Sequence, residues 1–296
     1  MKTIRCETVR GNPGLAMADR DPRQKALASR LAEKAYALLP LERQIVGIRF
    51  AHAESEFDEL PAREMRAKIP YCVLVRAAMS GRSVKLHRAL SGCRGGSRAL
   101  GFEAPGGDFT TGERFHRFGL YRDLEISRRV AAGMARCRLP AIGVMARPLE
   151  EYRDETPEVV ILALDPRNAM RLLQGYAWIH GPQINFRLTG NQALCVECTA
   201  YPLESGRMNI SLLCSGTRHH ARWKPHEMAL GMPFPRFAET VAGLLKTADA
   251  VTPDAEKRRI REAFMRLGYG DPGLTLGRTY YTDSSGGKGS RGETPS

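Results

Sequence analysis

The fold class is decided by one stretch, Val159-Val-Ile-Leu-Ala-Leu-Asp-Pro-Arg-Asn-Ala-Met-Arg-Leu-Leu-Gln174. Its first six residues are all apolar, which is typical of a buried β-strand. Asp165 then suits the N-cap of a helix and Pro166 suits its first position, and apolar residues follow at helical spacing. The stretch therefore predicts a buried strand that runs directly into a helix.

The segments on either side add further strands and helices in no regular βαβ order. This irregular order favours an α+β fold, with a mixed sheet, packed helices and a single main core, over a doubly wound sheet. We expect an acidic surface loop over residues 54–59. The other predicted strands cover residues 45–50, 83–86, 141–146, 184–188 and 208–214, and the other predicted helices cover residues 22–39, 71–79, 110–121, 123–135, 237–245 and 255–267.

Composition divides the 296-residue chain into four parts. Residues 1–21 contain little apolar sequence and are expected to form a flexible leader, and residues 22–250 form the α+β core domain. A charged amphipathic pattern predicts a C-terminal helix over residues 251–267. From residue 268 to residue 296 the apolar periodicity is lost, and we expect a disordered tail.

The chain carries a formal net charge of +13, which could attract phosphate backbones. The arginines are scattered along the whole sequence, however, and no helix-turn-helix, zinc-finger or RNA-stacking pattern is present. Nucleic acid is therefore not the expected partner. A bilayer needs about 20 apolar residues, and the longest aliphatic run covers only residues 159–164. No membrane attachment and a cytoplasmic location are expected.

The seven cysteines are expected to be reduced, because the start of the chain is charged where a secretion signal would be apolar. An odd number also argues against a fully paired disulfide framework. The lone CxxC motif, Cys195 to Cys198, lacks the position of a thioredoxin motif and the second CxxC of a zinc ribbon. Cys93 and Cys214 lie beside glycines in predicted turns, where a rigid scaffold could position their thiolates as metal ligands. Simple core packing of the cysteines remains the alternative.

Four phrases of the sequence together resemble a large prokaryotic family catalogued as domain of unknown function 169. The likeness covers about residues 41–245, and the phrases occur in the family's order and spacing. One departure is Gly92-Cys93-Arg94-Gly95, where the family pattern resembles Ser-Cys-Pro-Gly. The phrases are Tyr71-Cys72 with Arg76-Ala77-Ala78, then Ser91 to Phe102, then Asp165 to Gln174, then Asn209 to Arg218.

The resemblance implies a family pattern with cysteines at Cys72, Cys93, Cys195 and Cys214, and it leaves Cys6, Cys137 and Cys198 outside that pattern. It implies no general activity. Four such thiols favour a soft metal centre, and ligands from distant segments suit an iron–sulfur cluster, a 4Fe-4S cluster among the options, better than zinc.

The resulting hypothesis is a cytoplasmic iron–sulfur protein that acts as an oxidoreductase or a cluster-dependent lyase. A small anionic substrate would meet Arg76, Arg98 and Arg218, because arginine forks onto carboxylate and phosphate. A redox partner protein is the other expected partner. Two alternatives remain: a binding or accessory module with structural cysteines, and an enzyme with a cysteine nucleophile assisted by an arginine or by His219 or His220.

Overall fold

The strand β5 (Val159–Leu164) shows how the sequence builds the centre of the molecule. In the computed structural model, which describes residues 26–104, 106–183 and 185–280, all six of its side chains are buried. Val160, Leu162 and Leu164 face one hydrophobic cluster, and the alternating residues Val159, Ile161 and Ala163 face a second cluster. This alternation follows from the two-residue period of a strand and places a core on each face of the sheet.

The described residues form one seven-stranded sheet in the order β2-β3-β4-β1-β5-β7-β6. The pair β2–β3 is parallel and the other pairs of neighbouring strands are antiparallel. This arrangement confirms the predicted α+β fold with a mixed sheet. The other strands are β1 (Val46–Ala51), β2 (Arg63–Glu64), β3 (Val84–His87), β4 (Gly143–Pro148), β6 (Asn209–Ser211) and β7 (Met228–Pro233).

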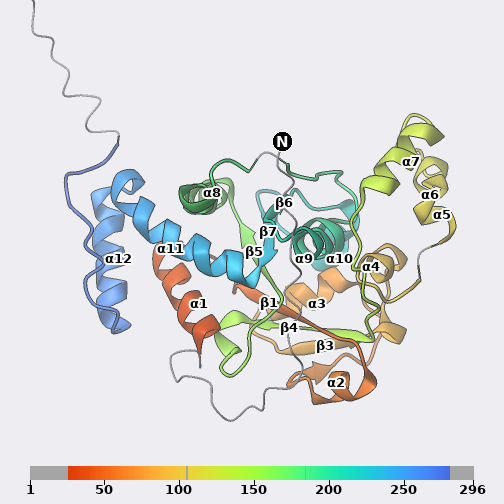
Figure 1. Ribbon diagram of the computed structural model, residues 1–296, viewed down its shortest axis with the longest axis horizontal. Helices are drawn as coiled ribbons and strands as arrows, with labels where there is room; N and C mark the ends of the chain where they lie inside the picture. The colour runs from red at the N-terminus through yellow and green to blue at the C-terminus, as the bar shows by residue number, and fades with distance from the viewer. Residues whose placement is uncertain (1–25, 105, 184, 281–296) are drawn as a thin grey trace, which may run out of the picture.

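Helices cover both faces of the sheet (Figure 1). The first face is covered by α1 (Leu27–Leu38), α8 (Pro166–His180) and α11 (Phe234–Val251), with α12 (Asp254–Arg266) outside them. The second face is covered by α3 (Tyr71–Ala78), α4 (Arg94–Ala99), the π-helix η3 (Ala193–Ala200) and α10 (Ser215–Ala221). Further short helices are α2 (Glu54–Glu59), η1 (Arg88–Leu90), η2 (Leu149–Glu151) and α9 (Tyr201–Ser205).

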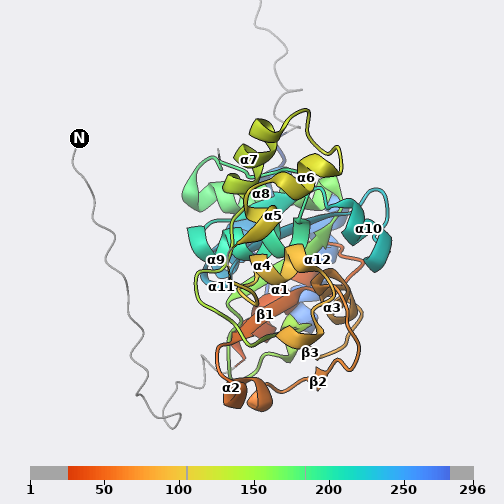
Figure 2. The same cartoon turned by 90° about the vertical axis from the view of Figure 1, so that its right-hand side faces the viewer.

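Three helices between α4 and β4 extend from the second face. They are α5 (Gly107–Thr110), α6 (Glu113–Arg117) and α7 (Leu124–Gly133). Figure 1 shows them at the opposite side of the molecule from α12, and Figure 2 views them from the front. Phe115 anchors this part of the chain because its side chain is only 6% exposed. These helices therefore form a wall beside α4.

Most predicted elements agree with the structure, and the errors are local. Residues 54–59 form the helix α2 and not a loop, because Phe57 is buried beneath an otherwise acidic surface. The predicted helix over residues 110–121 is divided between α5 and α6. Residues 185–188 form no strand, residue 184 lies outside the described ranges, and β7 and η3 were not predicted.

The two ends of the chain also bear on the predicted domain boundaries. Residues 1–21, the expected leader, and residues 281–296 lie outside the described part of the chain. The C-terminal segment, residues 268–280, has no helix or strand, but Leu274 is buried in the first-face cluster. Lys257 of α12, itself fully buried, donates to the carbonyl oxygens of Thr275 and Arg278. These contacts attach the segment, for which the sequence predicted disorder, to α12 and to the first-face cluster.

Candidate functional site

The four cysteines picked out by sequence lie around one cavity of about 400 Å³ on the second face of the sheet. We call this cavity the cysteine pocket. Besides Cys72, Cys93, Cys195 and Cys214, it is lined by Pro70, Tyr71, Gly92, Arg94, Gly95, Gly96, Phe109, Arg114, Phe115, Asn191, Gln192, Ser215, Gly216, Thr217 and His220.

Each of the four cysteines comes from a different helix, three of them at the helix start. Cys72 lies in the first turn of α3, and Cys195 lies in η3. Cys93 caps α4 and accepts a hydrogen bond from Gly96 N at 3.5 Å. Cys214 caps α10 in the same way and accepts from Thr217 N at 3.4 Å.

Two contacts show how closely the four cysteines approach one another. The Thr217 hydroxyl lies 3.2 Å from Cys214 Sγ and also hydrogen bonds to Cys72. A Cβ placed on Gly96 would lie 3.8 Å from Cys93 Sγ and 3.9 Å from Cys195 Cβ. Thr217 therefore lies between Cys72 and Cys214, and Gly96 lies between Cys93 and Cys195.

Burial decides the acidity of the two inner thiols. It raises the pKa of Cys72 to about 11, against the lowering effect of the Thr217 hydrogen bond. Burial also raises the pKa of Cys195 well above its usual value, and the nearby Cys93, Cys214 and Cys72 raise it further. Each pKa rises because an isolated charge is poorly solvated in the pocket and the neighbouring thiolates would repel it. A cation would be needed to hold these two sulfurs as thiolates near neutral pH.

The π-helix η3 brings Cys195 to the pocket because it packs tightly against the sheet. A Cβ on Gly231 of β7 would lie 2.0 Å from the carbonyl oxygen of Cys198, so only glycine fits there. The Glu197 carboxylate is 2% exposed and accepts hydrogen bonds from Thr189 N and Ser211 Oγ. π-Helices are rare and often occur at functional sites.

The two remaining cysteines of the described chain lie elsewhere. Cys137 is 3% exposed and Cys198 is fully buried, and neither lines the cysteine pocket. Cys6 lies outside the described residues. The structure therefore separates Cys195 from its CxxC partner Cys198 by placing only the first at the pocket.

The three arginines expected to meet a substrate do not line the cysteine pocket. Arg218 donates to the carbonyl oxygens of Leu212, Lys224 and Glu227. Arg76 donates to Ser80 Oγ at 2.6 Å, and Arg98 donates to Thr110 Oγ1. Their guanidinium groups thus hold the structure around the pocket.

Other basic side chains stand at the pocket, and the sequence reasoning missed two of them. Arg94 and Arg114 line it, together with His220 but not His219. Arg94 directly follows Cys93, so its position next to a candidate ligand was the available signal. Arg114 comes from α6 and carried no such signal in the sequence.

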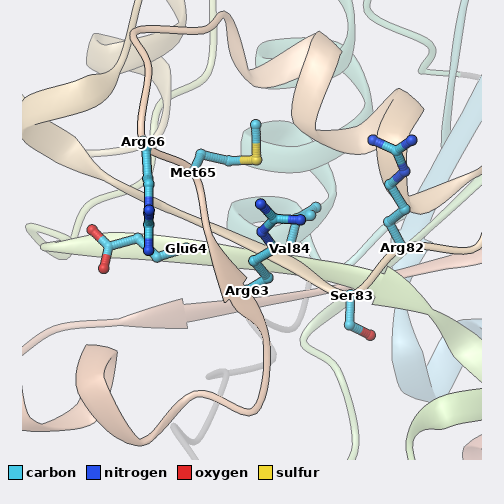
Figure 3. A pocket seen from close by; sticks show the side chains of 7 residues that line it. All are labelled: Arg63, Glu64, Met65, Arg66, Arg82, Ser83 and Val84. Carbon is cyan, nitrogen blue, oxygen red and sulfur yellow. The ribbon is translucent and has the colours of Figure 1, made fainter.

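A second cavity, of about 600 Å³, lies at the β2 edge of the sheet and is lined by residues 63–66 and 82–84. Figure 3 shows its long side chains spread along the edge, with Arg66 and Arg82 far apart. Its lining contains no cysteine, no histidine and no convergent set of polar groups, so this cavity is a weaker candidate for a metal-binding or catalytic site than the cysteine pocket.

Two further properties of the described ranges concern metal binding and membrane insertion. No group of three or more His, Cys, Asp or Glu side chains there is arranged to hold a single metal ion. In the same ranges, no helix combines the length and apolar character needed to cross a bilayer.

Comparison with known proteins places the chain in a family. The family model of domain of unknown function 169, described as "Uncharacterised ArCR", matches residues 36–243, more than half of the chain. A protein of Methanocaldococcus jannaschii, named uncharacterized protein MJ0308, is 24% identical over 216 residues, which cover 72% of this chain and 91% of that protein. No solved structure matches the chain significantly. The chain therefore belongs to the uncharacterised family of domain of unknown function 169.

Proposed function

We propose that this chain is an iron–sulfur protein whose cluster is ligated by Cys72, Cys93, Cys195 and Cys214. The proposal rests on one observation: four cysteines from distant segments line the same cavity, whereas Cys137 and Cys198 do not line it. Core packing alone gives no reason for this division, because a buried cysteine serves equally well anywhere in a hydrophobic cluster.

The spread of the cysteines favours a cluster over a single ion. Thiolates bound to one zinc ion lie about 2.3 Å from it and must converge on one point. No described group of side chains converges in this way. In a 4Fe-4S cluster each of four cysteines binds a different iron, so the ligands surround a larger volume. A cavity of about 400 Å³ leaves room for such a group.

The electrostatics of the cysteine pocket also suit a cationic iron centre. Burial disfavours the thiolate forms of Cys72 and Cys195, and metal coordination reverses that preference because it removes the proton outright. The backbone N–H groups that point at Cys93 Sγ and Cys214 Sγ would remain as hydrogen bonds to the ligand sulfurs. Such bonds help to set the potential of a cluster.

Exposure on one side favours a reactive role over pure electron storage. Cys93 is exposed and Cys214 is partly exposed, whereas Cys72 and Cys195 are buried. A molecule could therefore approach the cluster from the side of Cys93. With four cysteine ligands the group would serve an oxidoreductase, and with three it would offer an open iron to a lyase substrate. A reducing compartment such as the cytoplasm would keep the thiols free for assembly.

The alternative is a ligand-binding or accessory module with structural cysteines. It is favoured by the membership of Cys72 and Cys195 in the second-face hydrophobic cluster, where each thiol behaves as a small apolar side chain. This reading predicts a folded protein that binds its ligand without metal.

The test is anaerobic purification followed by measurement of iron, zinc and acid-labile sulfide and of the visible absorption spectrum. We expect a brown protein that contains iron and sulfide in nearly equal amounts. A colourless, metal-free protein with native circular dichroism would refute the cluster and support the binding module.

A further inference from the structure

The mouth of the cysteine pocket carries positive charge that the described protein does not neutralise. Arg94 has no carboxylate within 4.0 Å among the described residues. The Nη1 atom of Arg114 lies 3.9 Å from Asp108 Oδ2, and Arg117 lies closer to the same oxygen, at 3.3 Å. Of the two arginines that line the cavity, Arg94 therefore has no such partner, and Arg114 shares Asp108 with Arg117.

A single aromatic ring brings these two groups together. The guanidinium carbon of Arg114 lies 4.7 Å from the centroid of Phe109, and that of Arg94 lies 5.8 Å from it. Arg98 contacts the same ring at 5.4 Å, but its guanidinium is bound to Thr110 and stays outside the cavity. Arg94 and Arg114 therefore lie near the same ring and line the same cavity.

The wall beside the arginines is aromatic. Phe109 and Phe115 line the cavity and meet edge to face, with their centroids 5.7 Å apart. Phe115 also meets the ring of Tyr121, whose hydroxyl accepts a hydrogen bond from Asn191 Nδ2 at 2.8 Å. This hydrogen bond joins the wall to the segment that leads into η3. The mouth is thus a fixed surface with two positive groups and an apolar face.

From this arrangement, we infer that the cysteine pocket binds a small organic carboxylate. Arg94 and Arg114 hold its carboxylate group, because the planar guanidinium fork matches carboxylate geometry. Its apolar body lies against Phe109 and Phe115, a surface that inorganic phosphate would leave uncovered. The inference rests on the proposed function in one respect: the cluster fills the sulfur end of the cavity, so the bound carboxylate lies next to it.

The test is isothermal titration of the anaerobically purified protein with benzoate, phenylacetate and succinate. The neutral amides of these acids and inorganic phosphate serve as comparison probes. We expect at least one of the acids to bind and its amide not to bind. Arg94→Ala and Arg114→Ala should each weaken binding about tenfold to a hundredfold, the usual effect of losing a charge-assisted hydrogen bond. Arg129→Ala is the control, because Arg129 is an exposed arginine of α7 that does not line the pocket, and it should leave binding unchanged.

Two results would overturn the inference: none of the three acids binds, or binding survives both pocket substitutions. Tighter binding of phosphate than of every acid would overturn the choice of carboxylate. Iron and sulfide are measured on the same samples, which separates the two proposals. A protein that holds a cluster and binds no acid contradicts only the carboxylate site, and a metal-free protein that binds an acid through Arg94 and Arg114 contradicts only the cluster.

Discussion

Replacing Gly231 with alanine tests whether η3, and with it Cys195, lies where the structure places it. The added Cβ would lie 2.0 Å from the carbonyl oxygen of Cys198 and 2.6 Å from that residue's carbonyl carbon and Cα. These are backbone atoms, so no side-chain rotation can relieve the clash. Either the π-helix or β7 must shift, and Cys195 moves with the helix.

Overpacking of this kind costs about 1–3 kcal/mol, and a clash with backbone belongs at the upper end, near 3 kcal/mol. The smaller entropy of the unfolded alanine chain returns only about 0.4–1 kcal/mol. A net loss of about 2 kcal/mol lowers the melting temperature of a domain of this size by about 4–8 °C. The free energy of unfolding is measured by urea denaturation followed by circular dichroism.

Gly216→Ala is the matched control for this substitution. Gly216 lies in α10 beside the same pocket, and the nearest atom to its added Cβ is Cys214 Sγ at 3.9 Å, an ordinary contact. Alanine inside a helix should raise stability by about 0.5–1 kcal/mol. If Gly231→Ala unfolds at the wild-type urea concentration, η3 does not pack on β7 as described, and the assignment of Cys195 to the pocket loses its basis.

Three further predictions concern parts of the structure around the site. In metal-free native protein, iodoacetamide should modify Cys93 rapidly and Cys137 only after unfolding, because Cys93 is exposed and Cys137 is buried; equal rates by mass spectrometry would contradict this. Glu227→Gln should cost about 3 kcal/mol at pH 7 by breaking a buried ion pair with Arg43. Burial alone would raise the pKa of Glu227, but hydrogen bonding to Arg43 lowers it overall. The stability lost in Glu227→Gln should therefore become smaller below about pH 4.3, where the wild-type carboxylate also becomes protonated. Urea denaturation at several pH values measures this change. Lys257→Met should lower the free energy of unfolding by about 1.5–3 kcal/mol and expose the C-terminal segment to trypsin, because the charged hydrogen bonds from Lys257 to that segment are lost. Unchanged resistance to trypsin would show that Lys257 does not hold the segment in place.

The sequence predicted the central sheet well because its strands carry a strong signal. β5 is a continuous apolar run, and the Asp165 side chain accepts from Asn168 N at 2.7 Å, as expected of the predicted N-cap. β7 was missed because its sequence, Met-Ala-Leu-Gly-Met-Pro, contains no β-branched residue and includes a glycine and a proline, which are both uncommon inside strands. Its glycine is required by tertiary contact with η3, which no local pattern can reveal.

The site was only partly accessible from the sequence. Successive pocket cysteines lie 21, 102 and 19 positions apart in the sequence, so spacing did not join them, and the family resemblance did. The choice of arginines depended on motif position alone. Arg218 belongs to a matching phrase, yet its donors are directed at backbone carbonyls. Arg114 reaches the pocket only because α5 and α6 turn back over α4, which is a property of the folded chain.

The most direct test of the central claim is the iron and acid-labile sulfide content of six single Cys→Ser variants, purified anaerobically beside the wild type. We expect substitution of any of the four pocket cysteines, Cys72, Cys93, Cys195 or Cys214, to lower both contents strongly. We expect Cys137→Ser and Cys198→Ser to retain the wild-type content, because those thiols lie outside the pocket. Wild-type protein without iron, or a loss of iron that follows Cys137 or Cys198 in place of the pocket cysteines, would contradict the central claim.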